Sequence, residues 1–133
     1  MYRIFSDGGS RGNPGPAAYA IVVEKDGAVV FERAEFIGIN TNNYAEYRGL
    51  IAGISRAIEM GIGDVELISD SEIVIRQMKG LYKVKGRNIL ELHRDAVALS
   101  SQISHVKFTH MRRHEGLIPR ADALLNQELD RNV

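Results

Sequence analysis

Two acidic residues of this chain end strand-like stretches, where a charge is unusual. Asp7 ends the alternating stretch 2–7, and Asp70 ends the stretch 64–70; each lies on the same side as the apolar residue two positions before it. If the two strands are parallel neighbours, both carboxylates emerge at the same end of the sheet. Open α/β sheets bind their ligands at that end.

Two further acids lie on predicted helices. Glu46 lies on the flank of the apolar stripe of a helix predicted over 41–63, and Asp122 shares a face with leucines in the first turn of the last helix. Both therefore point toward the sheet. Taken singly, each acid also has an ordinary explanation: Asp70 could cap the following helix, and Glu46 and Asp122 could favour the positive ends of their helices.

Together, four inward-pointing acids at one end of a sheet favour a metal site. Such carboxylates repel one another and become protonated unless cations hold them. The chain has no cysteine and no close pair of histidines, so the donors are oxygens, which suits Mg²⁺ or Mn²⁺ rather than Zn²⁺. Two such ions about 4 Å apart can stabilise both ends of a phosphodiester displacement. Phosphodiester hydrolysis is the chemistry that this set indicates.

The elements that must position these acids follow the order βββαβααβα. The expected elements are a strand over 2–7, a hairpin over 18–38 that turns at Asp26-Gly27, a helix over 41–63, a strand over 64–70, helices over 71–80 and 88–103, a strand over 104–111 and a helix over 119–131. A hairpin-led sheet continued by helix-linked strands is a mixed α/β fold. The glycine-rich stretch 8–15 is expected to be a loop, in which Gly8 and Gly9 let the backbone approach a ligand.

Composition narrows the class of protein. The 133 residues are expected to form one domain, residues 1–133, and no targeting or membrane-spanning segment is visible, so a cytoplasmic protein without a membrane partner is predicted. Seventeen basic residues balance seventeen acidic ones, so a nucleic acid must be held by a local patch. The stretch 76–87 supplies five Lys and Arg without an acid, although most such runs are simply solvated faces.

Four sequence blocks resemble, in order and spacing, the signature blocks of ribonuclease H, type 1. They are SDGGSRGNPGPAAYA, TNNYAEYRGLIAGI, SDSEIVIRQMKG and HEGLIPRADALLN, and they run through nearly the whole chain. The resemblance implies a ribonuclease H-like fold: a five-stranded mixed sheet, with three antiparallel and then two parallel strands, flanked by helices. It also implies an endonuclease that hydrolyses the RNA strand of RNA/DNA hybrids and leaves 5′-phosphate and 3′-hydroxyl ends.

The resemblance assigns roles to particular residues. Asp7, Glu46, Asp70 and Asp122 match the catalytic carboxylates that hold two Mg²⁺ ions, with Mn²⁺ as an alternative, and His114 matches a mobile histidine that assists proton transfer or product release. A second alignment puts His110 and Arg113 in the functional positions instead. The usual asparagine between this histidine and the last aspartate is replaced by Arg120.

The resemblance also implies a substrate-binding set. Its members are Gly8, Gly9 and Ser10 at ribose hydroxyls, Asn13 and Thr41 near a DNA phosphate, and Asn42 and Asn43 in the minor groove. Thr41 to Asn43 equally suit a helix N-cap. Many members carry a longer basic segment with tryptophan after the third block; this chain has no tryptophan. Hybrid binding is therefore expected either to be weak or to be helped there by Lys79, Lys83, Lys85 and Arg87.

Two other functions stay open at this stage. One is a hybrid-binding module that has lost turnover, against which the complete set of carboxylates argues. The other is a nuclease that also cuts double-stranded RNA, or that cuts DNA, although the GGS and TNN stretches disfavour DNA. A monomer is expected.

Overall fold

The computed structural model of the protein describes residues 1–133. The strands are β1 (Tyr2–Ser10), β2 (Gly15–Lys25), β3 (Ala28–Asn40), β4 (Asp64–Ser69) and β5 (His105–His110), and the helices are α1 (Asn42–Glu59), α2 (Glu72–Met78), α3 (Arg87–Ser100) and α4 (Ile118–Asn132). The predicted order of elements is confirmed. No helix is long and apolar enough to cross a membrane.

The five strands form one mixed sheet in the order β3-β2-β1-β4-β5. The pairs β1–β2 and β2–β3 are antiparallel, whereas β1–β4 and β4–β5 are parallel. This is the predicted arrangement of three antiparallel and then two parallel strands. The hairpin turns at Asp26 and Gly27, which both have positive φ angles, as a two-residue hairpin turn requires.

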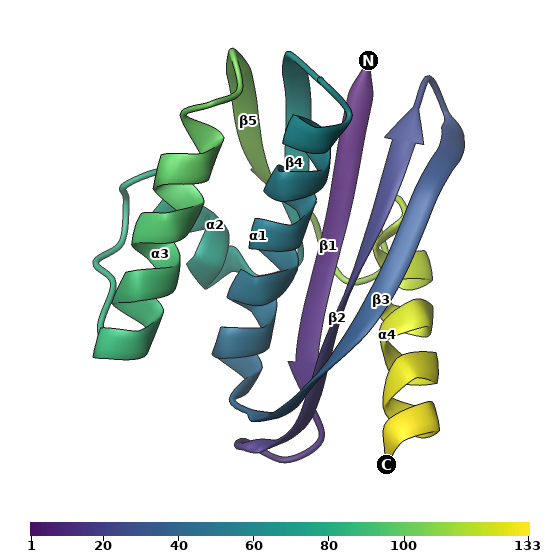
Figure 1. The fold of residues 1–133 in the computed structure, drawn as a ribbon, viewed down its shortest axis with the longest axis vertical. Helices are drawn as coiled ribbons and strands as arrows, with labels where there is room; N and C mark the ends of the chain where they lie inside the picture. The colour runs from purple at the N-terminus through teal and green to yellow at the C-terminus, as the bar shows by residue number, and fades with distance from the viewer.

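Helices cover both faces of this sheet (Figure 1): α1, α2 and α3 lie on one face, and α4 lies on the other. Alternation along the strands explains the division, because neighbouring residues point to opposite faces. On β1, Ile4 belongs to the hydrophobic cluster under α1 and Phe5 to the cluster under α4. Asp7 has the parity of Phe5 and therefore belongs to the α4 face.

One expectation about β1 was wrong. The strand does not end at Asp7 but continues to Ser10, and Gly8, Gly9 and Ser10 pair with β2. Asp7 instead follows the last residue of β1 that pairs with β4, because the parallel pairing of these two strands stops at Ser6 and Ser69. Only the antiparallel ladder continues, so the loop between β1 and β2 is shorter than predicted.

Side-chain caps fix where the helices near the site begin. The Thr41 hydroxyl accepts from the backbone N–H of Tyr44 at 3.2 Å and starts α1, as predicted. The Ser71 hydroxyl accepts from the N–H of Val74 at 3.3 Å and starts α2. Because Ser71 is the cap, Asp70 is not needed for that role.

Candidate active site

A cavity of about 500 Å³ lies beside β1, in the gap left where β4 stops. Along one edge, β1 pairs with β4 only as far as Ser6, and no strand pairs with that edge of β1 beyond this residue. Groups from both faces of the sheet can therefore meet there. The cavity is lined by Asp7, Gly8, Gly9, Ser10, Arg11, Asn42, Glu46, Asp70, Ser71, Glu72, Ile73, Arg113, Asp122, Leu125, Asn126 and Leu129.

All four predicted carboxylates line this cavity. Asp7 comes from β1, Glu46 from the second turn of α1, Asp70 from the residue after β4, and Asp122 from α4. Asp122 lies in the second turn of α4, not the first as expected, because the helix already begins at Ile118. The chain thus brings together acids that are far apart in the sequence.

Asp7 has the most perturbed carboxyl group of the site. Its residue is only 7% exposed. Burial, the negative charges of Asp70 and Asp122, a side-chain hydrogen bond with Asp122, and the charge of Glu46 together raise the pKa of Asp7 to about 8. Near neutral pH the free protein therefore keeps a proton on Asp7.

The pKa values of Glu46 and Asp70 are raised as well, in both cases chiefly by burial. Hydrogen bonds from Ser71 and Asn42 act in the opposite direction on the pKa of Glu46. The contact with Asn42 is a 2.8 Å bond from its side-chain amide to Oε1 of Glu46. The positive charge of Arg113 is the largest influence that lowers the pKa of Asp70.

This donor set fits hard divalent cations. It consists of carboxylate oxygens. The pKa of Asp7 is raised by burial and, after burial, by the negative charges of the other three acids, which a cation would offset. No three His, Asp or Glu side chains are gathered closely enough to hold an ion as they stand. An ion held by three or more of the carboxylates would therefore require them to turn toward one another within the cavity.

Gly8 is a glycine for a reason that the sequence did not reveal. A Cβ atom on Gly8 would lie 2.3 Å from the carbonyl carbon and oxygen of Ala45 and 2.5 Å from the backbone nitrogen of Glu46. The missing side chain thus lets α1 approach β1 and carry Glu46 into the site. At Gly9 the nearest atoms lie 3.5 Å away, on Asn42 and Leu125, which is ordinary contact.

The predicted substrate-binding residues of the two blocks lie close together. Asn42 connects them: its Oδ1 accepts from the N–H of Ser10 at 3.1 Å, and its own N–H donates to Oδ1 of Asn13 at 3.0 Å. Gly8, Gly9, Ser10 and Asn42 line the cavity, whereas Asn13, Thr41 and Asn43 lie outside its lining. The start of α1 is therefore fixed to the β1–β2 loop.

The predicted basic residues Lys79, Lys83 and Lys85 lie outside the cavity, as does Arg87. All four are exposed. The three lysines occupy the segment that joins α2 to α3, and Arg87 begins α3. A buried contact holds this segment: Oε1 of Gln77 accepts from the Tyr47 hydroxyl at 2.6 Å, and Nε2 of Gln77 donates to the carbonyl of Lys83 at 3.1 Å.

The residues named by the two alignments of the segment before α4 lie in different places. Arg113 lines the cavity, and its positive charge acts to lower the pKa of Asp70. His110 has a weaker effect in the same direction on that pKa. His114 is exposed and is not part of the lining. Arg120 points elsewhere, because its guanidinium forms two bonds to Glu32 of β3, at 2.5 and 3.1 Å.

Sequence reasoning gave no role at the cavity to Arg11, Ile73, Leu125, Asn126 and Leu129, all of which line it. Helical spacing places Leu125 and Leu129 on the face of Asp122, which they follow by three and seven positions. Asn126 is an ordinary exposed residue of that helix. Nothing in the sequence separates Arg11 from an ordinary loop arginine.

The strand order β3-β2-β1-β4-β5, with α4 alone on one face and acids at the end of β4, defines the ribonuclease H-like class of α/β proteins. A family described as "Reverse transcriptase-like" matches residues 5–123. Ribonuclease HI of Halobacterium salinarum is 39% identical over 127 residues, which is 95% of this chain and 63% of that protein. The chain belongs to the ribonuclease H family.

Other relatives agree with this assignment. The bifunctional protein Rv2228c of Mycobacterium tuberculosis is 43% identical over 129 residues, 96% of this chain and 35% of that protein. LC11-RNase H1, solved in complex with an RNA/DNA hybrid, is 34% identical, with a TM-score of 0.91 and 99% of both chains covered. The chain thus spans about a third of the mycobacterial relative and less than two thirds of the halobacterial one.

Proposed function

We propose that the chain is an endonuclease that hydrolyses the RNA strand of RNA/DNA hybrids with two divalent cations, giving 5′-phosphate and 3′-hydroxyl ends. One observation carries this proposal: Asp7, Glu46, Asp70 and Asp122 line a single cavity although they come from four separate segments of the chain. A binding module without turnover would have no need for such a costly collection of acids.

Mg²⁺ or Mn²⁺ held by these four residues would supply activation of the attacking water and stabilisation of the leaving 3′ oxygen. The protein prepares the site in several ways. The Asn42 amide orients the Glu46 carboxylate through their 2.8 Å bond. Arg113 favours the charged form of Asp70. Asp7 must lose its proton for the ion to bind, since a protonated carboxyl is a poor ligand.

Several features support a hybrid as substrate. LC11-RNase H1 was solved with an RNA/DNA hybrid, and it resembles this chain over nearly its full length. The unpaired edge of β1 beyond Ser6 leaves backbone groups at the cavity. Backbone donors and acceptors can contact ribose 2′-hydroxyls, which distinguish RNA from DNA. We assign this contact to Gly8, Gly9 and Ser10.

Arg113 is the cationic residue that we assign to the reaction from the segment before α4. An arginine is always protonated and cannot act as a base, so its contribution is electrostatic: it favours the charged form of Asp70 and offsets negative charge that develops on the phosphate. His114 is exposed outside the cavity, so we expect its contribution to be smaller than that of Arg113.

We further propose that one copy of the chain suffices, because one chain supplies all four carboxylates of the cavity. Absence of cysteine is compatible with action in the reducing cytoplasm.

The variant Asp70→Asn tests the catalytic assignment. Asparagine keeps the shape of the side chain but removes the negative charge, so cleavage of labelled hybrid in Mg²⁺ is expected to fall to background. Hybrid binding, measured by fluorescence anisotropy, and the unfolding midpoint are expected to persist. Full turnover by Asp70→Asn would remove this residue from the metal site.

A further inference from the structure

We propose that Arg11 binds a backbone phosphate of the nucleic acid at the α4 side of the cavity. This inference rests on the proposed function, because it assumes a polyanionic substrate. Two cationic residues line the cavity, Arg11 and Arg113. They approach it from different sides: Arg113 acts on Asp70 at the end of β4, whereas Arg11 contacts α4. A nucleic acid strand that crosses the carboxylates therefore meets a guanidinium on each side.

The backbone of Arg11 is held in place. Its N–H donates to the carbonyl of Pro16 at 2.8 Å across the β1–β2 loop. The preceding residue, Ser10, donates its N–H to Asn42 at the start of α1. A side chain on a fixed backbone can reach a ligand at a lower entropic cost than one on a mobile loop. The loop thus presents Arg11 at a defined place beside the cavity.

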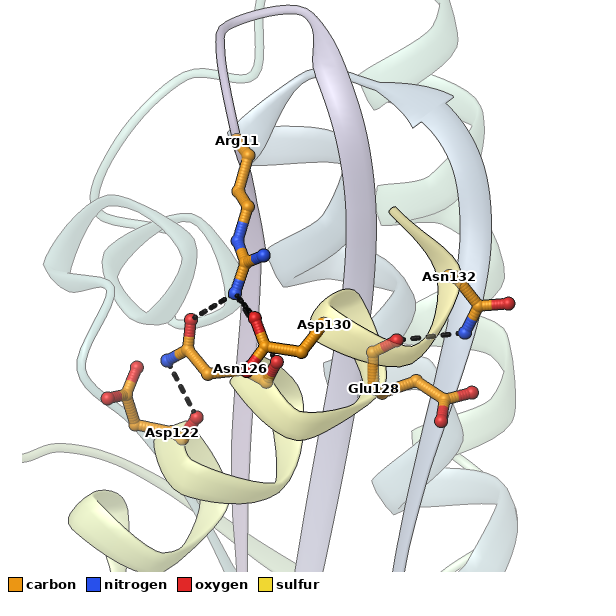
Figure 2. Close-up of polar contacts among 6 residues, drawn as sticks. All are labelled: Arg11, Asp122, Asn126, Glu128, Asp130 and Asn132. Atoms are coloured by element: carbon orange, nitrogen blue, oxygen red, sulfur yellow. Dashed lines mark hydrogen bonds and ion pairs between the residues drawn. The ribbon is translucent and has the colours of Figure 1, made fainter.

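The guanidinium of Arg11 has donors to spare. Nη2 alone makes the contacts that the structure contains, with Oδ1 of Asp130 at 2.6 Å, the carbonyl of Asn126 at 3.3 Å and Oδ1 of Asn126 at 3.5 Å. Figure 2 shows this nitrogen between Asn126 and Asp130. Nε and Nη1 donate to no protein group. A phosphate accepts two parallel N–H bonds from arginine, and each parallel pair, Nε with Nη2 or Nη1 with Nη2, becomes available when Nη2 leaves Asp130.

The present partner of Arg11 is easily exchanged. The side chain of Asp130 is 69% exposed and that of Arg11 is 39% exposed. Ion pairs at such exposure contribute little to stability and are screened by salt. Asp130 accepts from Arg11 through one oxygen only, whereas a phosphate that accepts from two nitrogens of the guanidinium would form two bonds. Binding of the nucleic acid can therefore replace the pair.

A purely structural role for Arg11 is the competing explanation. The side-chain amide of Asn126 donates to the carbonyl of Asp122 at 2.9 Å, so Arg11 also touches the helix that carries a catalytic acid (Figure 2). If Arg11 served only to fix α4, Arg11→Gln would weaken hybrid binding only as far as it loosens α4, and the salt dependence of binding would not change. If Arg11 binds a phosphate, loss of Asp130 would release the guanidinium for that contact. The variants Arg11→Gln and Asp130→Asn therefore separate the two roles.

The experiment measures hybrid affinity in Mg²⁺ against salt concentration, in an Asp70→Asn background that keeps the hybrid intact. We expect Arg11→Gln to weaken binding about 10-fold, the loss of one charge-assisted contact. We also expect it to lower the slope of log K against log salt by about 1. Arg11→Lys should keep the slope but recover only part of the affinity, because lysine lacks the fork. Asp130→Asn should bind as well as the background protein or better.

Two results would overturn the inference: an unchanged salt slope in Arg11→Gln, or an equal loss of affinity in Asp130→Asn. Thermal unfolding of each variant shows whether α4 has loosened. Failure of the proposed function is seen separately, because the unmodified chain would then not cleave the hybrid, or the Asp70→Asn protein would not bind it.

Discussion

Asp7 and Asp70 lie one position beyond the last paired row of two parallel strands, Ser6 of β1 and Ser69 of β4. Beyond that row the two strands differ. β1 continues to Ser10 beside β2, whereas β4 gives way to α2. This unequal ending opens the cavity and places both carboxylates at its wall.

The protonated state of Asp7 makes stability depend on pH. Its pKa is raised from an ordinary carboxyl value to about 8 in the folded protein. The folded state therefore binds more protons than the unfolded state between these two values, and stability falls as the pH rises through that range. Without divalent ions, the unfolding temperature is expected to be several degrees lower at pH 8.5 than at pH 5.5.

Magnesium and Asp7→Asn are the controls for this effect. Saturating Mg²⁺ should remove most of the loss at pH 8.5 by binding the deprotonated carboxylates of the folded state. Asp7→Asn should flatten the metal-free pH profile and bind Mg²⁺ more weakly. A metal-free unfolding temperature that is equal at both pH values would contradict the assigned pKa of Asp7.

The cleavage rates of the variants Arg113→Ala and His114→Ala test which of these two neighbouring residues takes part in the reaction. Arg113 lines the cavity and its charge opposes the burial that raises the pKa of Asp70, whereas His114 lies outside the lining. Removing Arg113 is expected to lower the cleavage rate about 10- to 100-fold, within or below the range for one electrostatic contact at a reaction centre. The pH at which Mg²⁺ binds should also rise. Initial rates under single-turnover conditions check this; a larger loss in His114→Ala would restore the first alignment.

Gly8→Ala and Gly9→Ala form a matched pair for the packing of α1 on β1. The added methyl group at Gly8 would lie 2.3 Å from the Ala45 backbone, whereas at Gly9 the nearest atoms lie 3.5 Å away. We expect Gly8→Ala to lower the free energy of unfolding by about 1–3 kcal/mol or more, as overpacking does, and to displace Glu46. Gly9→Ala should change stability little. Urea unfolding measures both, and equal stabilities would refute the close approach.

The Tyr47–Gln77 contact is expected to position the basic segment between α2 and α3. Gln77→Leu leaves the buried Tyr47 hydroxyl and the Lys83 carbonyl without their partner, at a cost of about 1–3 kcal/mol for an unsatisfied buried group. Hydrogen exchange in residues 79–86 should become faster and hybrid affinity should fall. Tyr47→Phe, which keeps the bond to Lys83, is the milder control, and unchanged exchange in Gln77→Leu would show that the segment is held by other contacts.

Much of the fold could be predicted from local patterns. Alternating apolar residues, the Asp26-Gly27 turn and the Ser71 cap each act within a few residues, so the order of elements was correct. The directions of the last two strands were expected from the resemblance to ribonuclease H, and the sheet agrees with them. The end of β1 was misplaced because it depends on a partner: Gly8 and Gly9 resemble loop residues, yet β2 continues to pair with them. Their conformation is decided by tertiary pairing, which overrides local preference.

The residues of the candidate site also divide into those that the local sequence could signal and those that only the fold brings together. The four acids stood out because a charge at a strand end or on an apolar flank is unusual, and all four line the cavity. Arg11 and Asn126 could not be found in this way, because an arginine in a loop and an asparagine on an exposed helix face are common. Only their contact, across more than a hundred residues of sequence, gives them significance.

The most direct test of the central claim is a gel assay of the purified chain. Labelled RNA/DNA hybrid, double-stranded RNA, single-stranded RNA and double-stranded DNA would each be incubated with Mg²⁺, with Mn²⁺ and with chelator. We predict cleavage of the RNA strand of the hybrid in either metal and none in chelator. Cleavage that persists in chelator, or an intact hybrid that the protein nevertheless binds, would contradict the metal-dependent nuclease; equal cleavage of double-stranded RNA or DNA would contradict its substrate.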